Sequence, residues 1–260
     1  MPAKICVKSM DEDQKQARRA SAERVVAEFG NAVPGKRLLC FFDDEDCEVF
    51  KDFAGPANRG FYTVINGGIP GGANCPEYIA RELLVDDGSW VRKRAFEHFI
   101  YLHGSVCEDS VGLTITFAHE LQHFIQTVRS PIAASASRLA LAMRKETSNP
   151  PDWNDWFCFP HEREARIVAK RIAFTIIGRE DVEEYIVRRI SKAVNDVDLR
   201  DWEFIQGIEP AETYDFPAAT REAYRYLGPF RDGLVRILES NKSDFPGFGV
   251  EDLDQLLSGE

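Results

Sequence analysis

The sequence predicts an α+β protein with a small N-terminal β-sheet and a mainly helical C-terminal half. Short apolar runs bounded by turn residues are typical of strands, and they occur only before residue 103. Helical periodicity dominates the chain after that point. Strands followed by helices favour an α+β fold over alternating α/β units. No shift in composition marks a linker, so we expect one domain over residues 1–260.

One helix and three strands are expected in the first part of the chain. Residues 11–29 are charged and helix-forming, and they end at Gly30, a residue that commonly stops helices. Residues 37–42 form an apolar run between turn signals, residues 61–65 are aromatic and β-branched, and residues 96–102 are again apolar. These compositions favour strands.

A strongly apolar helix is expected from about Val111 to Val128. Asp109 or Ser110 precedes it and can accept hydrogen bonds from the first N–H groups of the helix. Apolar residues surround most of its circumference, and a helix of this kind is usually central and buried. These residues are Leu113, Ile115, Phe117, Leu121, Phe124 and Ile125.

Further helices are expected downstream, some of them with recognisable ends. Pro160 suits the first position of a helix, and Gly178 suits the position after its last residue. The segment 148–152 contains two prolines and ends the helix before it. The expected helices are 131–145, 160–177, 180–194, 218–227 and 229–238, followed by a tail that contains Gly and Pro.

Composition and charge exclude several classes of protein. The net charge is −11, whereas general nucleic-acid binding requires a basic surface. No apolar run approaches the roughly 18–20 residues that span a bilayer, and the first residues lack the apolar stretch of a signal peptide. The six cysteines are scattered and form no C-x-x-C pair, which favours isolated thiols over disulfides. We therefore expect a cytoplasmic protein without nucleic-acid or membrane partners.

The apolar helix contains a motif that indicates metal chemistry. His119, Glu120 and His123 form an H-E-x-x-H sequence. Four residues of a helix advance about 400°, so the two imidazoles lie on one face, about 6 Å apart along the axis. Both can then bind one Zn²⁺ ion, and Glu120 can accept a proton from a metal-bound water. A metal also accounts for polar side chains on this apolar helix, because burying them without partners is costly.

A catalytic zinc ion needs a third protein ligand and an open coordination position. The long pattern H-E-x-x-H-x-x-G-x-x-H would put Gly at position 126 and His at position 129, but the sequence has Gln126 and Arg129. The third ligand must therefore come from elsewhere. The helix that begins at Pro160 offers the sequence H-E-R-E-A-R directly after its first residue.

These two segments, H-E-L-Q-H at 119–123 and E-R-E-A-R at 162–166, resemble the gluzincin metallopeptidases. In that family a second helix supplies a glutamate ligand. The resemblance implies a zincin-like fold with a buried HExxH helix. It also implies roles for individual residues: His119 and His123 as zinc ligands, Glu162 as the third ligand and Glu120 as the general base.

The resemblance departs from the family pattern at Arg166. Gluzincins usually have Asp or Asn there, which holds a ligand histidine through a hydrogen bond. An assignment shifted by two residues would make Glu164 the third ligand. Because Glu162 and Glu164 are about 200° apart on a helix, only one of them can face the metal. His161 is a weaker candidate ligand.

The resemblance implies a zinc-dependent hydrolase that cleaves peptide bonds of a protein or peptide substrate, with Glu120 activating a metal-bound water. The strand around Phe99–His103 could bind an extended peptide by strand addition. One alternative is a zinc-containing protein that binds a partner without turnover. Another is a metal-dependent amidase on a non-peptide substrate, with Cys75 or Cys107 as a ligand. Candidates for stabilising the oxyanion are His103, His161, Tyr214, Tyr224 and Tyr226.

Overall fold

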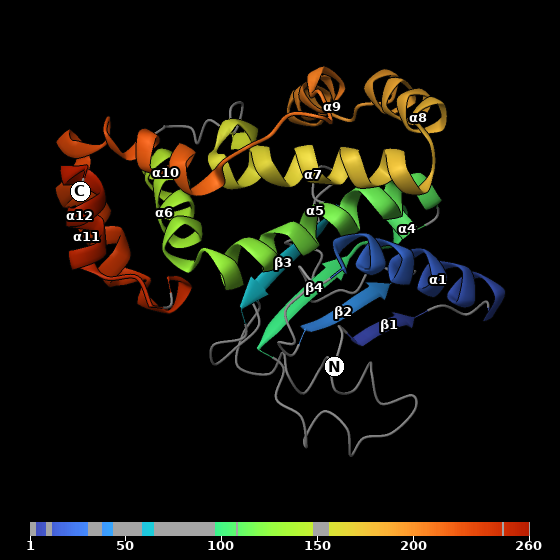
Figure 1. Cartoon of the computed structure of the whole chain (residues 1–260), viewed down its shortest axis with the longest axis horizontal. Helices are drawn as coiled ribbons and strands as arrows, with labels where there is room; N and C mark the ends of the chain where they lie inside the picture. Colours follow the sequence, from blue (N-terminus) through green and yellow to red (C-terminus); the bar gives the residue numbers. More distant parts are fainter. Residues whose placement is uncertain are drawn as a thin grey trace, which may run out of the picture. The chain divides into compact units, whose positions relative to one another are not determined.

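The computed structural model describes residues 4–8, 12–30, 38–43, 59–64, 97–107, 109–147, 156–245 and 247–259. Its strands are β1 (Lys4–Lys8), β2 (Leu38–Asp43), β3 (Gly60–Val64) and β4 (His98–Leu102). Its α-helices are α1 (Glu12–Phe29), α4 (Gly104–Cys107), α5 (Ser110–Arg129), α6 (Pro131–Thr147), α7 (Pro160–Ile176), α8 (Arg179–Ser191), α9 (Asp196–Gly207), α10 (Phe216–Tyr224), α11 (Arg231–Ser240) and α12 (Val250–Ser258). Figure 1 labels these elements along the chain, and they confirm the α+β class.

Contacts divide the chain into two compact units. One comprises Met1–Phe124 with Ile172–Tyr185, and the other comprises Ile125–Arg171 with Ile186–Glu260. The borders between the units fall inside α5, α7 and α8, each of which is a continuous helix. The sequence predicts one domain over residues 1–260. The division into two compact units does not test that prediction.

The first unit is built on a four-stranded sheet with the strand order β1-β2-β4-β3. β2 pairs in parallel with both β1 and β4, whereas β3 pairs antiparallel with β4. The residues of β2 from 38 to 42 and of β4 from 98 to 102 are buried. Strands that are covered on both faces have continuous apolar sequences, which is why composition predicts these two.

The segment around Phe99–His103 offers no open edge to a peptide. Its strand, β4, hydrogen-bonds to β2 on one side and to β3 on the other. The expected strand addition at this segment is therefore wrong. Within the described residues, β1 and β3 form the two edges of the sheet.

The apolar helix expected from residue 111 to 128 is α5. Asp109 is its cap, because Asp109 Oδ1 accepts a hydrogen bond from the backbone N–H of Val111 at 2.8 Å. All residues from 111 to 118 are buried, as expected for a central helix. Phe117 packs edge-on against Phe42 of the sheet, with 5.1 Å between ring centroids.

The second unit has an apolar core made by α6, α10, α11, α12 and the segment before α12. The largest buried side chains of this core are Leu139, Met143, Tyr224, Leu234, Ile237, Leu238, Phe245, Phe248 and Leu253. The hydroxyl of Tyr224 donates a hydrogen bond to the carbonyl oxygen of Ala136 at 2.7 Å. This bond joins α10 to α6 inside the core.

Four elements, β1, α4, α9 and α12, lie where the sequence analysis expects none. α9 begins at Asn195, whose side chain accepts a hydrogen bond from the backbone N–H of Asp198 at 2.9 Å. Its other end is held by Lys170 of α7. The Lys170 ammonium donates to the carbonyl oxygens of two residues in the last turn, Ile205 at 2.9 Å and Gln206 at 2.8 Å, and of Ile208 directly after the helix at 2.8 Å.

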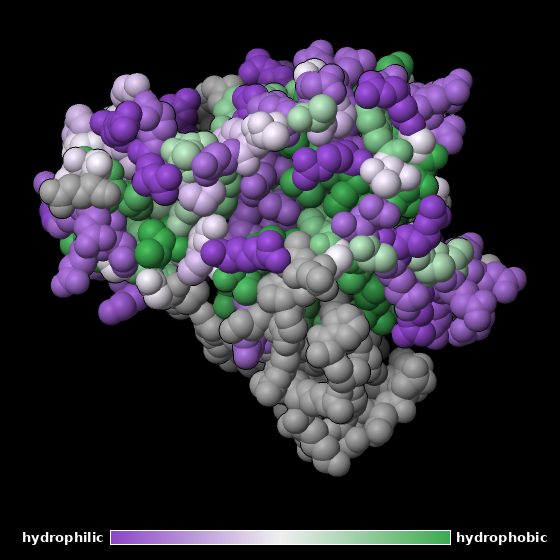
Figure 2. Space-filling model, viewed as in Figure 1, coloured by the Kyte–Doolittle hydropathy of each residue, from purple (hydrophilic) through white to green (hydrophobic). Residues whose placement is uncertain are grey.

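Polar side chains dominate the exposed surface of several helices. α1 is charged along its length and buries only Arg18, Ala22 and Val25, and Figure 2 shows its hydrophilic surface at the lower right. None of the helices in the described part of the chain is long and apolar enough to cross a membrane.

Candidate metal centre

His119 and His123 lie on one face of α5, one helical turn apart. Their Nε2 atoms are 3.0 Å apart, and the two rings stand almost perpendicular, with an interplanar angle of 89°. Both side chains are half-buried. The spacing i, i+4 therefore brings two imidazole nitrogens to one point, as the sequence predicts.

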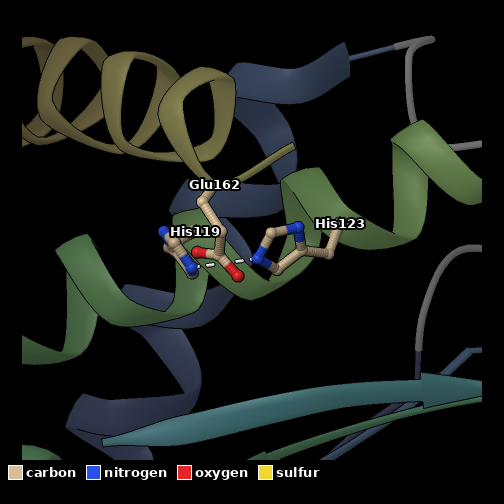
Figure 3. A group of neighbouring side chains, drawn as sticks. All are labelled: His119, His123 and Glu162. Carbon is tan, nitrogen blue, oxygen red and sulfur yellow. Dashed lines mark hydrogen bonds between the residues drawn. The ribbon is translucent and has the colours of Figure 1, made fainter. Parts of the chain in front are cut away.

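Glu162 completes a group of three possible metal ligands. It lies in the first turn of α7, and it is 7% exposed. One carboxylate oxygen of Glu162 and one nitrogen each of His119 and His123 lie within 4.8 Å of one another. Figure 3 shows the Glu162 carboxylate directed toward the two imidazoles.

The carboxylate of Glu162 is held by an arginine one turn further along α7. Arg166 Nη1 donates to Glu162 Oε2 at 2.7 Å, and Arg166 Nε donates to Asp201 Oδ1 of α9 at 2.7 Å. Arg166 is only 3% exposed, and burial by itself lowers the pKa of its guanidinium. The negative charges of Asp201 and Glu162 outweigh this effect and raise the Arg166 pKa, so the arginine stays charged.

His161 contacts the other side of the Glu162 carboxylate. Its Nε2 atom is 3.5 Å from Glu162 Oε1, and its Nδ1 atom is 2.7 Å from Ser137 Oγ. Ser137 Oγ also accepts the backbone N–H of His161 at 3.3 Å, so the serine contacts both the ring and the main chain of His161. Among the described residues, His161 is not part of the group of possible ligands.

Glu164, the alternative third ligand, has a different partner. Gln126 Nε2 donates to Glu164 Oε2 at 2.8 Å and to the carbonyl oxygen of His161 at 2.9 Å. Of the two glutamates, the structure brings Glu162 together with the histidines. Gln126 occupies the position where the long HExxH pattern has glycine, and here it ties the end of α5 to the start of α7.

Lys145 places a further charge within electrostatic reach of Glu162. Its side chain is partly buried, and this burial lowers the pKa of the ammonium group. The negative charge of Glu162 opposes that shift. Glu120 follows His119 directly in the sequence of α5 and is 7% exposed.

The candidates for oxyanion stabilisation have different surroundings. Tyr224 is fully buried in the core of the second unit, and Tyr226 is 73% exposed. Tyr214 packs against the Arg163 guanidinium, and burial raises its pKa to about 12 although Arg163 opposes the shift. His103 is half-buried after β4. Among the described residues, His103 does not belong to the group with Glu162.

The cysteines expected as alternative ligands do not join the group either. Cys107 is buried in α4, and among the described residues it does not lie with the histidines. Cys75 lies outside the described residues, as do the glycine-rich loop 66–72 and most of the acidic run 43–46.

The donor set fits a divalent transition-metal ion. Two nitrogen ligands at ~2.0–2.1 Å from a tetrahedral Zn²⁺ lie about 3.3–3.4 Å apart, close to the 3.0 Å between the two Nε2 atoms. Two imidazoles and one carboxylate leave the fourth tetrahedral position open. The same donors also suit other divalent transition metals, so the set is not specific to zinc.

Sequence reasoning missed the groups that surround Glu162. Ser137, Arg166 and Asp201 come from three helices, and the Arg166–Asp201 contact joins positions 35 residues apart. In the sequence, Arg166 stands out only because Asp or Asn is expected at this position. A charged residue one turn after a candidate ligand, on the same helix face, is a signal that could have predicted the ion pair with Glu162.

No family model matches this chain, and no curated protein or solved structure is similar enough to count as a match. The group of His119, His123 and Glu162 could hold a metal ion, but it is not diagnostic of any one family.

Proposed function

We propose that this protein is a zinc-dependent hydrolase that cleaves peptide bonds of a protein or peptide, with a zincin-like fold of the gluzincin type. The observation that carries the proposal is the grouping of His119 and His123 from α5 with Glu162 from α7. These residue types are the ligands that catalytic zinc sites of the His₂Glu type use. Glu120, which follows the first ligand in the H-E-x-x-H sequence and is buried, supports hydrolysis rather than a purely structural metal.

In this proposal, His119, His123 and Glu162 hold the ion. Bound zinc supplies Lewis acidity, which polarises a carbonyl group and makes a neighbouring water easier to deprotonate. Glu120 accepts the proton of the attacking water and later delivers it to the leaving amine. Glu120 is 7% exposed, so its carboxylate has little contact with bulk solvent.

The test combines metal analysis with a proteolysis assay. We expect one zinc ion per chain in the purified protein and cleavage of an unfolded protein such as reduced casein. Glu120→Gln should keep the zinc and lose at least about 100-fold in rate, because it removes only the base. Purified protein that holds no metal, even after incubation with zinc, would contradict the proposal. Stoichiometric zinc without cleavage would favour a protein that binds a partner without turnover.

A further inference from the structure

The buried charges behind Glu162 form a continuous chain of contacts from α7 to α9. We propose that Arg166 and Asp201 are positioning residues that hold Glu162 in the orientation of a metal ligand. This inference rests on the proposed function, because it assumes that Glu162 binds the ion. It assigns a role to two residues that do not belong to the group of ligands.

The first argument is geometric. Arg166 Nη1 binds Glu162 Oε2 at 2.7 Å and also donates to the Glu162 carbonyl oxygen at 3.0 Å. His161 Nε2 lies 3.5 Å from the other carboxylate oxygen. The carboxylate is therefore contacted on both oxygens, and its rotation about the last side-chain bond is restricted. A ligand oriented before the metal arrives loses less conformational entropy on binding.

The second argument concerns charge. A cationic guanidinium next to a ligand carboxylate weakens the attraction of that carboxylate for a metal ion. Asp201 Oδ1 accepts from Arg166 Nε at 2.7 Å, so the buried group of Glu162, Arg166 and Asp201 keeps a net charge of −1. That is the charge a lone glutamate would offer. Asp201 thus allows Arg166 to orient Glu162 without neutralising it.

The third argument is that both positioning residues are themselves fixed. The Arg166 guanidinium lies over the Trp156 ring, 4.3 Å from its centroid. Asp201 is 6% exposed and lies on α9, whose C-terminal end is held by three hydrogen bonds from Lys170. Because Arg166 and Asp201 are both fixed by their surroundings, they can hold the Glu162 carboxylate in one orientation.

The test measures zinc affinity in folded variants. Asp201→Asn keeps an oxygen that can accept from Arg166 but removes the compensating charge. We expect its zinc dissociation constant to rise about tenfold or more, measured by competition with a chromophoric chelator. Arg166→Lys keeps the positive charge but cannot bridge two carboxylates, so we expect a similar loss. The visible spectrum of the Co²⁺-loaded variants should also shift, because it reports ligand geometry.

Glu212→Gln is the matched control. Glu212 accepts a hydrogen bond from Arg163 of α7 at 2.9 Å, but it is not part of the Glu162 network. Its zinc affinity should stay within twofold of the wild type. Far-UV circular dichroism identifies which variants are folded. If Asp201→Asn does not fold, the zinc affinity of Arg166→Lys tests the inference. A folded variant that binds zinc as tightly as the wild type, with an unchanged Co²⁺ spectrum, would overturn the inference alone. Failure of the wild type to bind zinc would instead remove the proposed function.

Discussion

Gln126 donates a hydrogen bond from its Nε2 atom to the carboxylate of Glu164 at 2.8 Å. This contact turns one of two closely spaced glutamates of α7 toward an amide, while the other, Glu162, lies with the histidines. Two acidic side chains only two positions apart thus have separate tasks. The difference between them is open to direct measurement.

Glu162→Gln and Glu164→Gln should therefore have different effects on metal binding. Glu162→Gln removes a charged ligand, and we expect at least a 100-fold loss of zinc affinity. Glu164→Gln removes only the partner of Gln126 and should change zinc affinity less than threefold. Isothermal titration with zinc measures both. If both variants lost the same amount of zinc affinity, the assignment of Glu162 rather than Glu164 as the third ligand would be wrong.

Zinc should raise the thermal stability of the folded protein. At a zinc concentration 100 times the dissociation constant, binding stabilises the native state by about 2.7 kcal/mol. For a chain of this size, that corresponds to a rise in Tm of roughly 5–10 °C in a calorimetric scan. EDTA should reverse the rise, and Mg²⁺, which prefers oxygen ligands, should not produce it. The same scan on His123→Ala should show no zinc effect.

Gly60 is required where β3 approaches β4. A Cβ atom at this position would lie 2.6 Å from the backbone oxygen of Tyr101, so the two strands would have to separate. We expect Gly60→Ala to lower the free energy of unfolding by about 1–3 kcal/mol. Gly207→Ala is the control, because a Cβ there meets no atom within 4 Å. Urea denaturation compares the two, and a neutral Gly60→Ala would show that the strand edge can shift.

Tyr224→Phe should destabilise the second unit. The variant keeps the ring but loses the buried hydrogen bond to Ala136, and we expect a cost of about 1–2 kcal/mol in urea denaturation. Tyr226→Phe removes the same hydroxyl from a side chain that is 73% exposed and should stay within about 0.5 kcal/mol of the wild type. If the two variants are equally stable, the bond between α10 and α6 contributes little.

Periodicity predicts the elements that bury a clear apolar face. α5 and β2 are of this kind, and their sequences alone indicate where they lie. α9 is not, because its buried positions include Asp198 and Asp201 beside Trp202 and Ile205. No apolar pattern can reveal such a helix. Its start was still readable, since Asn195 followed by acidic residues is a typical N-terminal signal.

The order of strands in the sheet could not be predicted from local patterns. β4 lies between β2 and β3, although β3 precedes it in the sequence. Pairing of this kind joins distant segments, so composition indicates that strands exist but not which one is an edge. The same limit applies to the candidate metal centre. His119 and His123 are close in sequence and were predicted together, whereas Asp201 lies 35 residues from Arg166.

The Arg166–Asp201 pair also bears on how this chain can diverge. Both side chains are buried, and loss of Arg166 alone would remove the cation that Asp201 and Glu162 share, at a cost of about 3–5 kcal/mol. Loss of Asp201 alone would leave Arg166 with Glu162 but without the second carboxylate. A lineage that replaces one of them is under pressure to replace the other, and we expect the two positions to co-vary among homologues. Arg231 and Asp254 form a similarly close contact on the surface. Because water can solvate either charge when its partner is replaced, we expect these two positions to vary independently. Correlated substitution at positions 166 and 201 is thus the evolutionary signal that we expect from this buried network.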